Sequence, residues 1–211
     1  MSDIKWSGLE DSAVEVISYG GSDELVYYAA KLTRYQSDDI KLDGVQGFLG
    51  ALMRMGHLSP FEHCSITYEL RCPIFVFRQV FRHRTAKICE LSLRATNAVH
   101  EFYLPDSLNK SEAGEYKKAV ESTYNTYLDL LNKGISKQTA RSILPVSLFS
   151  TALLTFDLRN LFHFLDLRMA KGAQWETRYV AKRMMVEGAV RFPASFGAYS
   201  ELKGIDMEEL V

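Results

Sequence analysis

The sequence predicts an α+β fold in which a small antiparallel or mixed sheet is flanked by helices within a single domain. Several short stretches alternate between apolar and polar residues, which is typical of half-buried strands, and longer stretches repeat apolar residues at helical spacing. The chain has 211 residues, enough for one domain with a sizeable core, and its sequence contains no internal repeat, low-complexity tract or linker. We therefore expect residues 1–211 to form one domain.

In the first part of the chain, turn and cap residues separate the expected elements. Gly20-Gly21 closes the first strand, and Ser22 is a suitable N-cap for the helix that follows. Gly56 can end the next helix, and Pro73 is well tolerated at a first helical position. The expected elements are strands at 13–19 and 64–71, and helices at 22–32, at 42–55 and from Pro73 through His83.

The rest of the chain continues this mixture of strands and helices. Gly134 and Pro193 stop two long helical patterns, and Ser136 can cap a short helix that carries Arg141 and halts near Pro145. The expected elements are strands at 99–104 and 150–157, and helices at 111–133, 160–169 and 173–192.

Composition narrows the classes of protein to consider. The formal net charge is -1, so we expect neither nucleic acid nor an anionic membrane as a partner. No apolar run is long enough to span a bilayer, and the N-terminus lacks a signal-peptide pattern. The three cysteines are odd in number and are not at metal-ligand or C-x-x-C spacing, which predicts a reducing cytoplasm and no metal site.

The stretch from Arg78 to Arg94 concentrates cations and polar residues directly after an apolar run. In a helix that continues from Pro73, Gln79, Arg82 and His83 fall at i, i+3 and i+4, which puts them on one face. Cations on an otherwise apolar element are costly unless an anion meets them. The stretch is therefore either an anion-binding surface or a salt-bridged, solvated face.

Arginines that are distant in the sequence suit a ligand with several phosphates, because arginine binds phosphate bidentately and keeps its charge when desolvated. No G-x-G-x-x-G or Walker pattern is present to bind phosphate through a glycine loop. The alternative is that each arginine pairs with an acid. The arginines concerned are Arg82, Arg84, Arg94, Arg141, Arg159 and Arg168.

The order of these residues resembles the signature of the flavin-dependent thymidylate synthases. The signature is Arg82-His83-Arg84, then seven residues, then Ser92, with Glu90 two residues before the serine and Arg94 two residues after it. Neighbouring blocks also resemble the family in order and spacing, so that the resemblance covers roughly residues 29–176. These blocks are Gly56-His57, Ser59-Pro60-Phe61-Glu62-His63, Leu158-Arg159, Leu167-Arg168 and Ala173-Gln174-Trp175-Glu176.

The resemblance implies both an activity and an assembly. The implied enzyme binds FAD, which NADPH reduces, and uses 5,10-methylenetetrahydrofolate as the carbon donor to convert dUMP to dTMP. The family fold is a sheet flanked by helices, assembled as a homotetramer with its sites at subunit interfaces. We therefore expect dUMP, a folate and further copies of the chain as partners.

Matched residue by residue, the resemblance assigns two sets of site residues. The dUMP set is Gln79, Arg82, Glu90, Leu91, Ser92, Leu93, Arg94, Arg141 and Arg168. The FAD set is Thr33, Ser59, Arg82, His83, Arg84, Glu90, Asp157, Arg159 and His163. Arg168 matches the residue that stabilises the ionised uracil N3, a catalytic role suited to a fixed guanidinium, because charge pushed onto the ring makes C5 nucleophilic.

Three further residues allow more than one interpretation. Ser92 is either a nucleophile, for which His83 and Glu90 are the candidate bases, or a serine that hydrogen-bonds the nucleotide. His57 and His63 lack the cysteine or acid set that a metal site needs, so we expect His57 to lie near the flavin and His63 to be structural.

Four positions depart from the usual family pattern: Lys87, Cys89, Ala95 and Asp157. They leave the preference among pyrimidines open. The alternatives are a methylase or hydroxymethylase of another pyrimidine nucleotide, such as dCMP, and a catalytically silent protein that binds flavin or nucleotide. Asp157 stands where asparagine is usual, and we expect it to pair with Arg159 or another cation, because an unpaired buried charge is costly.

Overall fold

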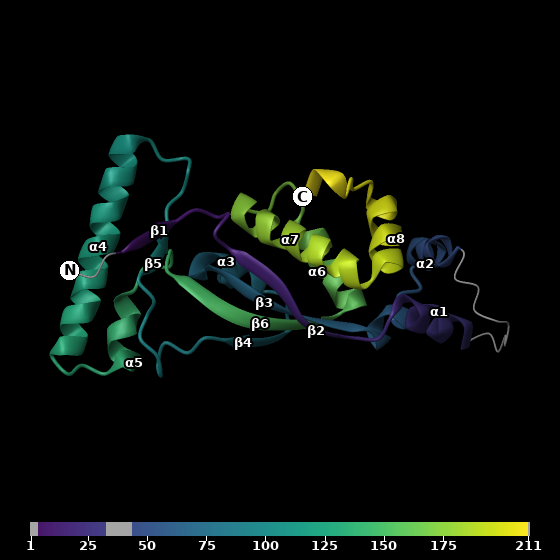
Figure 1. Ribbon diagram of the computed structural model, residues 1–211, viewed down its shortest axis with the longest axis horizontal. Helices are drawn as coiled ribbons and strands as arrows, with labels where there is room; N and C mark the ends of the chain where they lie inside the picture. The colour runs from purple at the N-terminus through teal and green to yellow at the C-terminus, as the bar shows by residue number, and fades with distance from the viewer. Residues whose placement is uncertain (1–3, 33–43, 211) are drawn as a thin grey trace. The chain divides into compact units, whose positions relative to one another are not determined.

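The computed structural model describes residues 4–32 and 44–210 (Figure 1). Its mixture of strands and helices confirms the predicted α+β class. A four-stranded sheet has the order β2-β3-β6-β4, and a two-stranded sheet pairs β1 with β5. The strands are β1 (Lys5–Ser7), β2 (Ala13–Gly20), β3 (Ser65–Pro73), β4 (Lys87–Glu90), β5 (Glu101–Tyr103) and β6 (Phe149–Asp157).

Helices account for most of the remaining described chain. The α-helices are α1 (Asp23–Leu32), α2 (Val45–Arg54), α3 (Ile74–Val80), α4 (Lys110–Asn132), α5 (Lys137–Ala140), α6 (Leu158–Arg168), α7 (Trp175–Arg191) and α8 (Pro193–Lys203). Short 3₁₀ helices are η1 (Ser59–His63), η2 (Arg141–Ile143) and η3 (Glu208–Leu210). None of the helices in residues 4–32 and 44–210 is long and apolar enough to cross a membrane.

The chain divides into two compact units. Unit 1 consists of Met1–Ala13, Leu70–Arg82 and Cys89–Ala152, and unit 2 consists of Val14–Glu69, His83–Ile88 and Leu153–Val211. Strands β3 and β6 contribute residues to both units. The expectation of one domain over the whole chain stays a prediction.

Unit 1 is organised around the long helix α4. Tyr124 and Tyr127 on this helix are buried in a cluster with Phe102 of β5, and the Tyr127 hydroxyl accepts a hydrogen bond from the Ala98 amide at 3.1 Å. Strand β1 pairs with β5 in parallel, with Trp6 opposite Phe102. The apolar face of α4 thus packs on the small sheet and leaves the opposite face to solvent.

Unit 2 packs helices on the inward-facing residues of β3 and β6. Ile66 and Tyr68 of β3 and Leu154 of β6 are fully buried, as the alternating pattern of a half-buried strand predicts. The Tyr68 hydroxyl donates to the Met184 carbonyl on α7 at 2.9 Å. This bond satisfies a polar group that burial would otherwise leave without a partner.

Most expected elements are confirmed within a few residues, and the exceptions have physical causes. Helix α3 ends at Val80, so the predicted common helical face of Gln79, Arg82 and His83 is wrong. The His83 side chain is buried instead against Phe156 in unit 2, a tertiary contact that local helix propensity does not encode.

One α-helix and two strands were not predicted, nor were the 3₁₀ helices η1 and η3. Pro193, expected only as a stop, also opens α8, where proline suits the first turn. The Asp23 carboxylate accepts from the amides of Ala194 and Ser195 at 2.8 and 3.0 Å and stabilises that helix start. The short strands β1 and β4 were also missed; every residue of β4 is exposed, so it has no alternating pattern. Positions 42 and 43 of the expected helix lie outside the described residues.

A buried carboxylate, Glu101 of β5, joins three segments of unit 1. It accepts hydrogen bonds from Ser7 Oγ at 2.6 Å and Lys5 Nζ at 2.9 Å, and it pairs with the Arg71 guanidinium. Burial alone would raise the pKa of Glu101, but the hydrogen bonds from these three side chains outweigh burial and lower the pKa to about 2.

We predict that Glu101→Gln destabilises the protein by about 1.5–3 kcal/mol at neutral pH, the typical worth of hydrogen bonds to a charged group. Because the folded-state pKa is lowered, the carboxylate contributes its full stability above its usual pKa of 4.5, and this contribution is lost as the pH falls toward 2. Urea unfolding between pH 7 and pH 3 should therefore show a smaller loss of stability on acidification for the variant than for the wild type. The control is Glu121→Gln, an exposed position on α4. Equal pH dependence of Glu101→Gln and wild type would contradict the assignment.

Candidate active site

Unit 1 contains all of the predicted dUMP set except Arg168. A cavity of about 390 Å³ brings part of this set together. Its lining residues are Ile74, Arg78, Glu90, Leu91, Leu93, Gln138, Arg141, Ser142, Leu144 and Val146. Glu90, Leu91, Leu93 and Arg141 are therefore gathered from two separate stretches of sequence, as the prediction of a shared site requires.

Backbone hydrogen bonds and caps hold the walls of this cavity. Glu90 ends β4, where its carboxylate accepts from Ser150 Oγ at 3.1 Å, and the Leu91 amide donates to the Thr151 carbonyl at 2.9 Å. Arg141 begins η2, directly after a short helix whose start is capped by Ser136, as predicted. Glu90 and Arg141 are thus both positioned by secondary structure, which favours a site that is formed before a ligand binds.

Besides Arg168, four residues of the predicted set do not line the cavity: Gln79, Arg82, Ser92 and Arg94. Ser92 is exposed, and its carbonyl accepts from the amides of Ala95 and Thr96 at 3.0 Å, so that it opens a turn. Within the part of unit 1 that the structure describes, the Ser92 hydroxyl makes no hydrogen bond to Glu90, whose carboxylate accepts from Ser150. This arrangement favours positioning over nucleophilic attack with Glu90 as the base.

Three polar lining residues were missed by sequence reasoning: Arg78, Gln138 and Ser142. Arg78 directly precedes Gln79, and Gln138 and Ser142 lie within one turn of Arg141. Helical spacing around Arg141 was the available signal, because residues three or four apart share a face.

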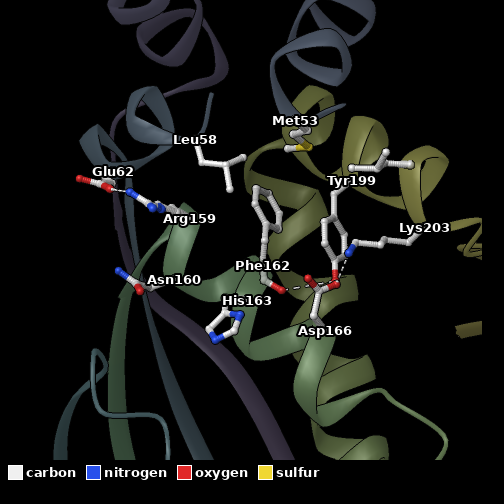
Figure 2. Close-up of a pocket in the computed structure, with 11 residues that line it drawn as sticks. Met53, Leu58, Glu62, Arg159, Asn160, Phe162, His163, Asp166, Tyr199 and Lys203 are labelled. Carbon is white, nitrogen blue, oxygen red and sulfur yellow. Dashed lines mark hydrogen bonds and ion pairs between the residues drawn. The ribbon is translucent and has the colours of Figure 1, made fainter. Parts of the chain in front are cut away.

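Unit 2 contains most of the predicted FAD set, together with Arg168. A cavity of about 500 Å³ lies in this unit (Figure 2). Its lining residues are Met53, Leu58, Glu62, Arg159, Asn160, Phe162, His163, Asp166, Tyr199, Leu202 and Lys203. Arg159 and His163 are the members of the predicted set that it brings together.

Helix α6 positions both of these residues. Asp157 is its N-cap: one carboxylate oxygen accepts from the Asn160 amide at 2.8 Å and the other from Asn160 Nδ2 at 2.6 Å. Arg159 pairs with Glu62 of η1, and Asp157 forms no ion pair with any described residue, so the predicted pairing of Asp157 with Arg159 or another cation is not found there. Position 157 therefore suits either aspartate or asparagine, because both side chains can cap a helix.

His83 lies among aromatic rings, next to His163, which lines the unit 2 cavity. Its ring centroid is 5.5 Å from that of His163 and 5.7 Å from that of Phe156, and the side chain is buried. Burial lowers the pKa of His83, and the nearby His163 and Arg168 lower it further. A hydrogen bond to the backbone of Asn160 acts in the opposite direction and raises the pKa, but it does not outweigh burial.

The far end of the cavity was missed by sequence reasoning. The Tyr199 hydroxyl donates to Asp166 at 2.8 Å, and Lys203 pairs with the same carboxylate at 2.7 Å, as Figure 2 shows. Burial, and then the hydrogen bond to Asp166, raise the pKa of Tyr199 far above its usual range. No sequence signal marked these residues, since Tyr199 and Lys203 belong to the unpredicted helix α8.

Other predicted flavin residues do not line this cavity. His57, Ser59 and Arg84 are exposed, as is His63, and Thr33 lies outside the described residues. Arg168 is the half-buried last residue of α6. The structure describes no cluster of three or more metal-ligating side chains in residues 4–32 and 44–210.

Comparison with known proteins identifies the family. The family model described as thymidylate synthase complementing protein matches residues 15–194. A flavin-dependent thymidylate synthase from Thermus thermophilus is 34% identical over 209 residues, covering 92% of this chain and 77% of that protein. One from Thermotoga neapolitana is 35% identical over 182 residues, covering 82% of this chain and 83% of that protein. The chain belongs to the flavin-dependent thymidylate synthase family.

Solved structures agree with this family assignment. A UMP/dUMP methylase, PolB from Streptomyces cacaoi, bound with 5-Br dUMP, has a TM-score of 0.88 and 29% identity, covering 96% of this chain and 99% of that chain. The same protein bound with 5-Br UMP has a TM-score of 0.84. The family membership that Arg82-His83-Arg84 and Ser92 indicated is therefore confirmed.

We predict that Asp157→Asn keeps the stability of the protein within about 0.5 kcal/mol, whereas Asp157→Ala loses about 0.5–2 kcal/mol, because only the first retains an N-cap acceptor for Asn160. Chemical unfolding of the three proteins at neutral pH would measure this difference. If Asp157→Asn were as destabilising as Asp157→Ala, the charge of Asp157 rather than its capping bond would be the stabilising feature.

Proposed function

We propose that this protein is an FAD-dependent thymidylate synthase that methylates dUMP to dTMP. The observation that carries the proposal is the unit 1 cavity, which Arg141 lines together with Glu90, Leu91 and Leu93 of the signature region. A guanidinium beside apolar walls suits an anionic nucleotide, since arginine binds phosphate bidentately. Family membership supplies the reaction type.

We assign roles to several residues of the dUMP set. Arg141 binds the phosphate, while Leu91 and Leu93 contact apolar surface of the nucleoside. Arg168 stabilises negative charge on the uracil ring at N3, which raises electron density at C5. Cys64 and Cys72 are buried, and the reaction that we propose needs no cysteine nucleophile.

The residues around the unit 2 cavity fit part of a bound flavin. Leu58 and Phe162 offer apolar walls, Arg159 offers a cation for phosphate, and Asn160 and His163 offer polar atoms near them. The buried Nε2 of His83, which has no hydrogen-bond partner among the described residues, is a further polar atom in unit 2. Bound FAD, reduced by NADPH, supplies the hydride that completes the methyl group, and 5,10-methylenetetrahydrofolate supplies the carbon. We also propose a cytoplasmic homotetramer.

A second candidate substrate is UMP. The observation that favours it is the similarity to PolB, whose name states that it methylates UMP and dUMP. The departures at Lys87 and Cys89 lie in β4, which leads into Glu90 of the unit 1 cavity. In this alternative, the enzyme accepts other pyrimidine nucleotides, such as UMP and dCMP.

Release of tritium from C5-labelled nucleotides tests the proposal directly. Protein supplied with FAD, NADPH and 5,10-methylenetetrahydrofolate should release tritium from dUMP, because methylation replaces the hydrogen at C5. Release from UMP or dCMP but not from dUMP would replace the proposed substrate. A flavin absorption spectrum without release from any of the three would identify a catalytically silent flavoprotein.

We predict that Arg168→Ala lowers kcat/KM for dUMP by roughly 100- to 1,000-fold, by analogy with the loss of one donor that stabilises an oxyanion. The thermal unfolding midpoint should change little in comparison, which separates lost chemistry from lost fold. Arg54→Ala, at the exposed end of α2, is the matched control. Near-normal turnover of Arg168→Ala would exclude a role in activating the ring.

Ser92→Ala should retain some turnover if Ser92 only positions the nucleotide. Complete inactivity of this variant with intact dUMP binding would support Ser92 as a nucleophile.

A further inference from the structure

Two guanidiniums, not one, line the unit 1 cavity. Arg141 was expected from the family resemblance, but Arg78 was not assigned to any ligand. We propose that Arg78 is a second phosphate-binding residue, which acts with Arg141 on the 5′-phosphate of the nucleotide substrate. The inference rests on the proposed function for the identity of that substrate.

The placement of Arg78 follows from the short helix α3. Val76, Phe77 and Val80 form its buried side, whereas Arg78 is exposed on the other side. Ile74, one turn earlier, lines the same cavity. Residues four apart share a helical face, so the wall that Ile74 forms is continued by Arg78.

Backbone hydrogen bonds to the segment that directly precedes β6 hold this wall in place. The Ile74 amide donates to the Leu148 carbonyl at 2.9 Å, and the Phe75 amide donates to the Val146 carbonyl at 3.0 Å. Val146 itself lines the cavity. The start of α3 is therefore fixed against the segment that follows Arg141, which holds the two guanidiniums on walls of one preformed cavity.

The charges of the cavity are unbalanced. Among the residues that the structure describes, neither Arg78 nor Arg141 forms an ion pair, in contrast to Arg71 and Arg159, which do. Glu90 is the acid among the lining residues, and its carboxylate accepts a hydrogen bond from Ser150. A ligand that covers these two cations would desolvate them, which is costly unless the ligand is an anion, so the cavity favours an anionic ligand.

The lining also defines the chemical class of that ligand. Apolar side chains such as Leu91, Leu144 and Val146 form much of the surface, while Gln138 and Ser142 add neutral hydrogen-bonding groups near Arg141. A compact anion attached to a flat, less polar body fits such a cavity. A nucleoside 5′-monophosphate has this form, and paired guanidiniums match the geometry of a phosphate dianion.

The proposal assigns a role that sequence matching gave to other residues. Gln79 and Arg82, one and four positions after Arg78, belong to the predicted dUMP set, yet neither lines the cavity that contains Arg141. Helix α3 ends at Val80, so that Arg82 is beyond the helix and does not share the face of Arg78. Within unit 1, Arg78 is the arginine of this stretch that the fold places with Arg141.

Calorimetric titration of the full-length protein with dUMP and with deoxyuridine tests the role of Arg78. We expect Arg78→Gln to weaken dUMP binding by roughly 10- to 100-fold, the loss of hydrogen bonds to a charged group, and to leave deoxyuridine binding unchanged, because the nucleoside has no phosphate. Arg78→Lys keeps the charge without the bidentate fork and should lose less affinity. Arg54→Gln is the control, and thermal unfolding of each variant reports on folding; if Arg78→Gln does not fold, Arg78→Lys carries the comparison.

The outcomes separate this inference from the proposed function. Unchanged dUMP affinity in Arg78→Gln, or an equal loss for dUMP and deoxyuridine, would overturn the phosphate role. If the wild type binds no dUMP, the same titrations are made with UMP, dCMP and inorganic phosphate. Binding of any of these that depends on Arg78 would support the phosphate site while the dUMP assignment fails, and the absence of such binding would overturn the inference.

Discussion

The cost of placing charge beside apolar surface determines most of the polar architecture of this protein. In unit 1, buried Glu101 is stable as a carboxylate because Arg71, Lys5 and Ser7 all donate to it. In unit 2, the exposed carboxylate of Asp166 accepts a hydrogen bond from Tyr199 and pairs with Lys203. Where this rule is satisfied within the chain the residues stabilise the fold, and where it is not, as at Arg141, a ligand is the natural source of the missing charge.

One residue connects the sheet to the helix that carries Arg159 and His163 of the predicted flavin set. Asp157 ends β6 and caps α6, so the direction of the strand and the start of the helix are set at the same point. Arg159, His163 and Arg168 then project from successive turns of α6. Aspartate performs the capping role at this position, and asparagine can perform it as well.

The two ligand sets lie largely in different units of the chain. The nucleotide set occupies the segments around β4 and η2, and the flavin set occupies η1, α6 and the segment that contains His83. Each unit has its own cavity, lined by part of its own set. The predicted nucleotide and flavin residues are therefore divided largely between two individually packed units of the chain.

The sequence alone determined the fold class, the family and most of the element boundaries. Alternating residues identified β3, and Ser22 and Ser136 identified helix starts, because strand burial and capping are local effects. The spacing from Arg82 to Ser92 identified the family without any structural information. These signals are readable because the physics behind them acts between residues that are close in the chain.

Only the tertiary structure decided where the side chains go. It ended α3 before Arg82, buried His83 against Phe156, paired Arg159 with Glu62, and placed Arg78 rather than Gln79 with Arg141. Each of these outcomes depends on a partner that is distant in the sequence, and the free energy of desolvating a charge depends on which partner the fold supplies. A single sequence lists the charges, but the fold decides which of them are neutralised internally and which remain for a ligand.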